Sequence, residues 1–127
     1  MRSALTSLLL AVAAPLVPVL ASAQSVVSGT WSGSVTDPSG KAKSVTYKVT
    51  RTRDTPSISL FDPTGSPVAF TDIREAGDTL LFNLAAGRQG ARLVCKLLRQ
   101  TDGAYEGTCS DPENRQGRMR MVPPPKE

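Results

Sequence analysis

Short runs in which apolar and polar residues alternate recur along most of the chain, separated by turn residues at intervals of about ten residues. The clearest run covers residues 44–52, where Val45, Tyr47 and Val49 alternate with polar side chains. A period of two is typical of strands that bury one face. The pattern predicts about eight strands, over residues 26–36, 44–52, 57–61, 68–73, 79–85, 91–100, 104–110 and 117–122.

The connections between these runs are short and rich in turn residues. Residues 37–40 and 62–65 share the pattern Asp-Pro-x-Gly, in which proline fixes one backbone angle and glycine tolerates unusual ones. Short connections join antiparallel neighbours, because parallel strands need long crossovers. The predicted fold class is therefore all-β: a single small antiparallel up-and-down β-barrel, or a flattened barrel or sandwich.

The alternation also predicts which side chains form the core. One face of the predicted strands collects Trp31, Val35, Val45, Tyr47, Val49, Ile58, Leu60, Val68, Phe70, Leu80, Phe82, Leu84, Leu93, Cys95, Leu97, Tyr105, Cys109, Met119 and Met121. Each large apolar side chain contributes roughly 1.5–3 kcal/mol when it is buried.

The two cysteines lie at equal distances from Thr101-Asp102-Gly103. A three-residue loop that ends in glycine is a common β-hairpin connection. With that loop, Cys95 lies directly opposite Cys109. The sequence therefore predicts a buried, structural cross-strand disulfide between Cys95 and Cys109.

The N-terminal residues have the features of a cleaved signal peptide. Arg2 precedes an apolar stretch, and Ala21-Ser22-Ala23 is a small-x-small cleavage pattern. We expect cleavage between Ala23 and Gln24, a barrel domain over residues 24–122, a proline-rich tail over 123–127 and no transmembrane segment in the processed chain. This organisation, with no Asn-x-Ser/Thr sequon, predicts a periplasmic or secreted bacterial protein.

Gly29-Thr30-Trp31 stands early in the first predicted strand. In an all-β meander this triplet resembles the Gly-x-Trp signature of the lipocalin and avidin-like (calycin) secreted β-barrels. The resemblance implies an up-and-down barrel with the tryptophan closing one end. It carries over no ligand-binding residue, because the match is limited to three residues and the chain has one tryptophan.

The composition argues against catalysis. The chain has no histidine, which removes the Ser-His-Asp and Cys-His arrangements, and both cysteines are expected to be oxidised. Most acidic residues fall in predicted turns, where aspartate stabilises the backbone. Asp111-Pro112-Glu113-Asn114 has oxygen ligands that would suit Ca²⁺, but its spacing favours a solvated loop. We expect no enzyme activity, no cofactor and no metal site.

The basic residues predict a candidate binding surface. Arg92 and Lys96 point outward from one predicted strand, Arg118 and Arg120 point outward from the last, and residues 104–110 lie between them. These four side chains form a cationic stripe that Glu106 partly neutralises, with Arg88, Arg99 and Arg115 near its ends. The stripe could bind an anionic partner, or it could be an ordinary solvated face. It has no aromatic side chains for base stacking, which argues against nucleic acid.

Two functions follow from these observations. The first is a small non-enzymatic binding or accessory protein of lipocalin-like architecture, which would hold a small apolar ligand at the barrel mouth. The second is a bacterial envelope module that binds an anionic envelope component through the basic outer face. The processed chain would carry 14 Lys and Arg against 11 Asp and Glu, a mild net charge of +3.

Overall fold

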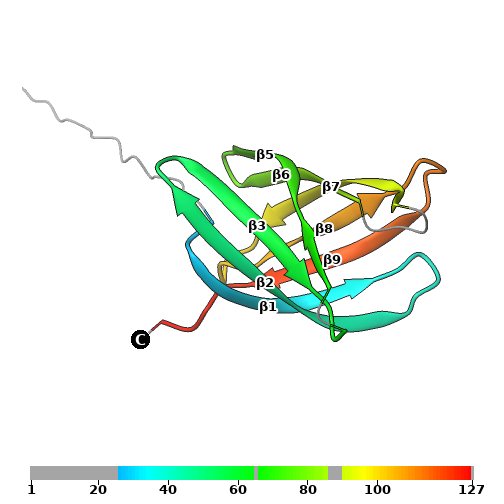
Figure 1. Cartoon of the computed structure of the whole chain (residues 1–127), viewed down its shortest axis with the longest axis horizontal. Helices are drawn as coiled ribbons and strands as arrows, with labels where there is room; N and C mark the ends of the chain where they lie inside the picture. The colour runs from blue at the N-terminus through cyan, green and yellow to red at the C-terminus, as the bar shows by residue number, and fades with distance from the viewer. Residues whose placement is uncertain (1–25, 65, 86–89, 127) are drawn as a thin grey trace, which may run out of the picture.

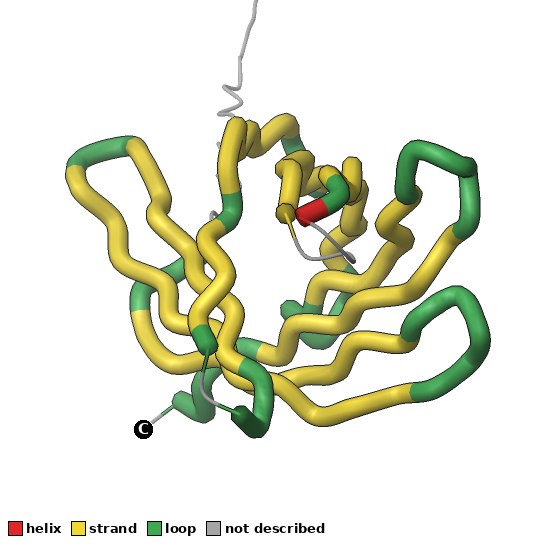
Figure 2. Tube along the Cα trace, turned by 45° about the vertical axis from the view of Figure 1, so that its right-hand side comes forward, coloured by secondary structure: helices red, strands yellow, loops and turns green. Residues whose placement is uncertain are grey.

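Nine antiparallel strands form a nearly closed barrel in the computed structural model, which describes residues 26–64, 66–85 and 90–126. Figure 1 colours the strands by their order along the chain, and in Figure 2 they surround a common centre. The strands are β1 (Gly29–Thr36), β2 (Ala42–Thr52), β3 (Thr55–Phe61), β4 (Pro67–Ala69), β5 (Thr71–Ala76), β6 (Thr79–Ala85), β7 (Arg92–Arg99), β8 (Tyr105–Ser110) and β9 (Gln116–Val122). The predicted all-β barrel is confirmed.

The strand order in the sheet is β4-β3-β2-β1-β9-β8-β7-β6-β5. Consecutive strands pair from β1 to β4 and again from β5 to β9, as expected for a meander. The first and last strands join the two halves, with Ser32 opposite Val122 and Thr36 opposite Arg118. The seam of the barrel therefore lies between β4 and β5, which are neighbours in sequence.

The structure has one strand more than the sequence pattern predicts, because the run over residues 68–73 is split at Phe70. The Phe70 N–H donates to the carbonyl oxygen of Ile58 at 2.9 Å, which ties the break to β3. Phe70 and Ile73 both pack toward the core, although an odd separation puts two residues of one strand on opposite faces. A bulge between Thr71 and Arg74 shifts the inward–outward alternation of side chains by one residue, and Asp72 adopts a φ of 52° there.

The predicted core is the observed core. Sixteen of the nineteen predicted side chains are buried, and the other three (Val35, Val68 and Leu93) pack against the cluster while partly exposed. The interior aromatic rings are in contact: the Phe70 and Phe82 rings stack at 4.0 Å between centroids, and Tyr47 meets Phe70 edge-on at 6.2 Å. Val26 and Ala104 are also buried, which the alternation did not predict.

Gly107 and Gly33 mark places where neighbouring backbones approach closely. A Cβ atom at Gly107 would lie 1.9 Å from the carbonyl oxygen of Lys96, and one at Gly33 would lie 1.9 Å from that of Arg120. No side chain fits at either distance. These glycines allow the tight coiling of β8 on β7 and of β1 on β9.

The disulfide between Cys95 and Cys109 is confirmed. The two residues are direct partners in the β7–β8 register, their Cα atoms are 4.0 Å apart, and both side chains are buried. The hairpin loop is the predicted one: the Gln100 N–H donates to the Ala104 carbonyl at 2.7 Å, and Gly103 has a φ of 90°. The disulfide is compatible with an oxidising compartment.

Beyond β9, the proline-rich segment continues in the same direction beside the start of β1. β9 ends at Val122, and a Cβ atom at Gly29 would lie 2.9 Å from Cγ of Pro124. The predicted signal peptide, residues 1–23, lies outside the described residues. Within the described ranges, none of the structure is a helix with the length and apolar character needed to cross a membrane.

Candidate anionic-partner surface

The structure places the predicted cationic stripe on the outer face of three adjacent strands. Arg92 and Lys96 come from β7, Arg118 and Arg120 come from β9, and β8 lies between them. Lys96 is opposite Thr108, which is opposite Arg118. Two strand spacings separate the Cα atoms of Lys96 and Arg118, which is about 10 Å.

The four cations differ in their electrostatic surroundings. Arg120 is half-buried; it makes an ion pair and hydrogen bond with Glu106, and its Nη2 lies 3.6 Å from Oδ2 of Asp102. Arg92, Lys96 and Arg118 are exposed and make no ion pair with any residue in the described part of the chain. The uncompensated charge therefore lies on β7 and at Arg118.

The arginines near the ends of the stripe are also compensated where the structure describes them. Arg99 lies 3.7 Å from Asp78, and Arg115 pairs with Asp111 at 2.9 Å and with Glu113 at 3.4 Å. Arg88 lies outside the described residues. The sequence indicated the role of Glu106, but not that of Asp102, because Asp102 reaches Arg120 from the hairpin loop.

A depression of about 190 Å³ lies on this outer surface, over β1, β9 and β8. It is lined by Ser34, Thr36, Glu106, Arg118, Met119 and Arg120. A guanidinium group beside two hydroxyl groups can donate several hydrogen bonds to one carboxylate, phosphate or sulfate group. The volume suits such a group but is smaller than the roughly 300 Å³ of a typical small-molecule pocket.

Side chains fill the part of the barrel interior in which an apolar ligand would have to bind. The buried side chains of Tyr47, Phe70 and Phe82 pack against one another inside the barrel, with the two phenylalanine rings stacked. The Tyr47 hydroxyl donates to the carbonyl oxygen of Arg120 at 3.0 Å, and burial raises the pKa of Tyr47 above its usual value. This tyrosine is a neutral part of the packing that also anchors β2 to β9.

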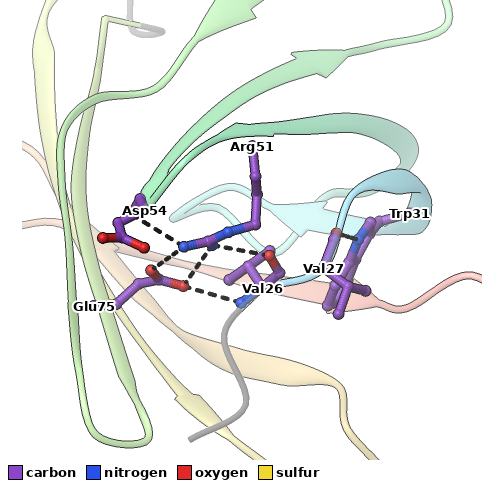
Figure 3. Close-up of polar contacts among 6 residues, drawn as sticks. All are labelled: Val26, Val27, Trp31, Arg51, Asp54 and Glu75. Carbon is purple, nitrogen blue, oxygen red and sulfur yellow. Dashed lines mark hydrogen bonds and ion pairs between the residues drawn. The ribbon is translucent and has the colours of Figure 1, made fainter.

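One end of the barrel is closed by a hydrogen-bonded cluster (Figure 3), which we call the clamp. It consists of the backbone groups of Val26 and Asp54 and the side chains of Arg51 and Glu75. The Val26 N–H donates to Oε2 of Glu75 at 2.9 Å, and Nη1 of Arg51 donates to the Val26 carbonyl at 3.0 Å. Arg51 also donates to both carboxylate oxygens of Glu75, at 3.1 and 3.2 Å, and to the Asp54 carbonyl at 3.1 Å. The clamp holds the fully buried Val26 across the barrel end.

Trp31 completes the packing at this end (Figure 3). Its side chain is buried, its ring centroid lies 6.1 Å from that of Tyr105, and its Nε1–H donates to the Val27 carbonyl at 2.9 Å. Burial raises the pKa of Tyr105. Trp31 thus fixes the chain that leads into β1, just after the clamp.

The turn carboxylates serve the backbone, as predicted. The Ser39 hydroxyl and the Lys41 N–H donate to Asp37 and hold the pKa of that carboxyl below its usual value. The Arg115 N–H does the same for Asp111, so residues 111–115 form an aspartate-capped turn. The part of the chain that the structure describes has no group of three His, Cys, Asp or Glu side chains arranged to hold a metal ion.

Comparisons with known proteins identify the fold. The structure resembles a redesigned β-barrel, with a TM-score of 0.59 and 11% sequence identity over 79% of this chain and 93% of that chain. It also resembles a de novo designed fluorescence-activating β-barrel, with a TM-score of 0.54 and 21% identity over 78% of this chain and 94% of that chain. No protein-family model and no curated protein match the sequence. The shared feature is the barrel itself.

Proposed function

We propose that this protein is a non-enzymatic binding domain of lipocalin-like architecture, secreted or periplasmic, whose partner is an anionic component of the bacterial envelope. The binding surface is the outer face of β7, β8 and β9. The observation that carries the proposal is the group of three exposed cations, Arg92, Lys96 and Arg118, that no described carboxylate neutralises.

The depression beside Arg118 supports a specific contact within this surface. Ser34 and Thr36 place hydroxyl groups at its edge, and the paired Arg120 and Glu106 form part of its wall. Glu106 would repel an anion that approached Arg120, so we assign the anion to Arg118. Arg120 then acts as a positioning residue that pairs with Glu106 and neutralises its charge in the wall of the depression.

The filled interior favours the outer face over the barrel mouth as the binding site. A small apolar ligand would have to displace the stacked Phe70 and Phe82 rings, and it would have to open the clamp at Val26. Both changes remove contacts that hold the fold together. Binding on the outer face needs no such change.

We propose a non-enzymatic protein because the groups that could act in catalysis are missing or already make structural bonds. The chain has no histidine, and Cys95 and Cys109 are joined. Asp37, Asp102 and Asp111 accept hydrogen bonds from their own turns. Glu75 is held by two donors at the clamp.

The test is binding to fluorescently labelled polyglutamate, followed by anisotropy. We expect K96E/R118E to weaken binding by about tenfold, because two charges at the contact are reversed. K48E/R53E is the matched control, since it makes the same change in net charge at exposed positions of β2 and its turn to β3, six or more residues along the strands from the Thr36–Arg118 pair, and it should bind like the parent. Equal losses in both variants would mean that binding follows net charge alone, and the proposed surface would be wrong.

A single-site comparison tests the assignment of roles. Arg118→Gln removes an uncompensated charge and should weaken binding about fivefold. Arg120→Gln removes a charge already balanced by Glu106 and Asp102. It should therefore weaken binding less than Arg118→Gln does, and the reverse order would contradict the assignment.

A further inference from the structure

The outer face of β7 alternates cations with exposed aliphatic side chains. Arg92, Val94, Lys96 and Leu98 all point outward, and Val94 and Leu98 are 58% and 48% exposed. The structure describes three large hydrophobic side chains with this degree of exposure, and two of them flank Lys96. Leu81 of β6 lies directly opposite Lys96 and is partly exposed. We call this set (Leu81, Arg92, Val94, Lys96 and Leu98) the β7 patch.

A second copy of the chain is a poor occupant for the β7 patch. A two-fold interface brings the same surface of both copies together. Lys96 and Arg92 would then lie near the same cations of the other copy, whereas the carboxylates that border the patch, Asp72 and Glu106, already bond to Asn83 and Arg120. Like charges at an interface oppose association.

A nucleic acid is also a poor occupant. Single strands bind through bases that stack on aromatic side chains, whereas the outward residues of β7 and its neighbour β8 are aliphatic, hydroxylic or charged. A fully hydrated polyanion would use the cations but would leave Val94 and Leu98 without a partner. The occupant that uses both kinds of side chain has negative charge and hydrocarbon within a few ångströms of each other.

We propose that the β7 patch binds the surface of an anionic lipid bilayer, an inference that rests on the proposed function and names its partner. The headgroup layer places negative charge beside the cations, and the region just beneath it accepts short aliphatic side chains. Lys96 and Arg92 contact phosphate groups, while Val94 and Leu98 enter the interface. Arg118 contacts a further headgroup two strands away.

The experiment is co-sedimentation of the disulfide-bonded protein with vesicles of phosphatidylcholine alone, or with about one-third phosphatidylglycerol, at low and moderate salt. We expect binding to the anionic vesicles only. V94S/L98S should weaken that binding by about tenfold, because two aliphatic side chains no longer enter the interface. Lys96→Gln should weaken it by about fivefold.

Two control variants match these changes. Val27→Ser alters the remaining strongly exposed hydrophobic side chain (53% exposed), which lies before β1. Lys48→Gln removes an exposed cation from β2, opposite Thr30 and away from Arg118. Both should bind vesicles like the parent protein.

The same variants are then measured against polyglutamate, which separates the two proposals. If V94S/L98S binds polyglutamate normally but loses the vesicles, the bilayer inference is supported. If the parent binds polyglutamate but not anionic vesicles, or if V94S/L98S binds vesicles as well as the parent, the bilayer inference is overturned and the proposed function stands. If the parent binds neither probe, both are overturned.

Discussion

Reduction of the Cys95–Cys109 disulfide should lower the free energy of unfolding by about 3 kcal/mol. The bridge joins residues 14 apart, so it closes a loop of 15 residues in the unfolded chain. The chain-entropy model assigns about 3 kcal/mol to a loop of this length. In the folded chain, the β7–β8 register alone brings the two residues together, so reduction leaves the folded backbone in place.

The assay is urea unfolding of the oxidised protein and of the same protein in excess reductant, monitored by the fluorescence of Trp31. A small domain is stable by about 5–15 kcal/mol, so the reduced chain should still fold, with a lower midpoint. Its melting temperature should fall by about 12–24 °C, since 1 kcal/mol corresponds to roughly 4–8 °C at this size.

The double variant C95A/C109A provides the control. It should be less stable than the reduced protein by about 1 kcal/mol or more, because two buried sulfur atoms are also lost, and reductant should not affect it. A difference below about 1 kcal/mol between oxidised and reduced protein would refute the chain-entropy argument. It would mean that the unfolded chain already keeps this hairpin together.

Three further predictions concern the backbone, the clamp and pH. Gly107→Ala should destabilise the protein by about 3 kcal/mol or more, since the new Cβ would meet backbone atoms that cannot move aside. Urea unfolding measures this loss, and a value below about 1 kcal/mol would contradict the tight approach of β7 and β8. Glu75→Ala should lower the free energy of unfolding by about 2–3 kcal/mol, because it removes an acceptor shared by Arg51 and a backbone N–H. A double-mutant cycle with Arg51→Ala that shows no coupling energy would contradict the clamp. The lowered pKa values of Asp37 and Asp111 predict that these two carboxylates contribute stability in full above about pH 4, and that this contribution is lost as pH drops through their folded-state pKa values. The D37N/D111N variant should therefore lose less stability than the parent between pH 5 and pH 3, and an equal loss would contradict this.

The sequence pattern predicted the features that depend on local alternation and turn chemistry. Once the loop at Thr101-Asp102-Gly103 is recognised, counting back from it along both strands fixes the β8 partners of residues 94–99, including Cys95. The same period places Lys96 and Arg118 on one outer face. These predictions succeed because each one concerns residues close in sequence or paired by a short turn.

The features that the pattern missed depend on contacts between distant residues. Glu75 meets the Val26 N–H across 49 positions, and an alternating pattern carries no signal for such a contact. Asp102 reaches Arg120 only because the hairpin loop folds over the end of β9. The break at Phe70 could have been suspected from the odd spacing of Phe70 and Ile73, which one regular strand cannot bury together.

The position of Phe70 limits how this barrel could be engineered into a carrier for small molecules. Its backbone is bonded to β3 on one side of the seam, and its ring stacks on Phe82 of β6 on the other. Removing the Phe70 ring to create space would therefore loosen the closure of the wall as well. Phe82 lies in a strand that is paired on both sides, so its truncation empties the interior while the seam keeps its hydrogen bond. A designer would begin at Phe82 and leave Phe70 in place.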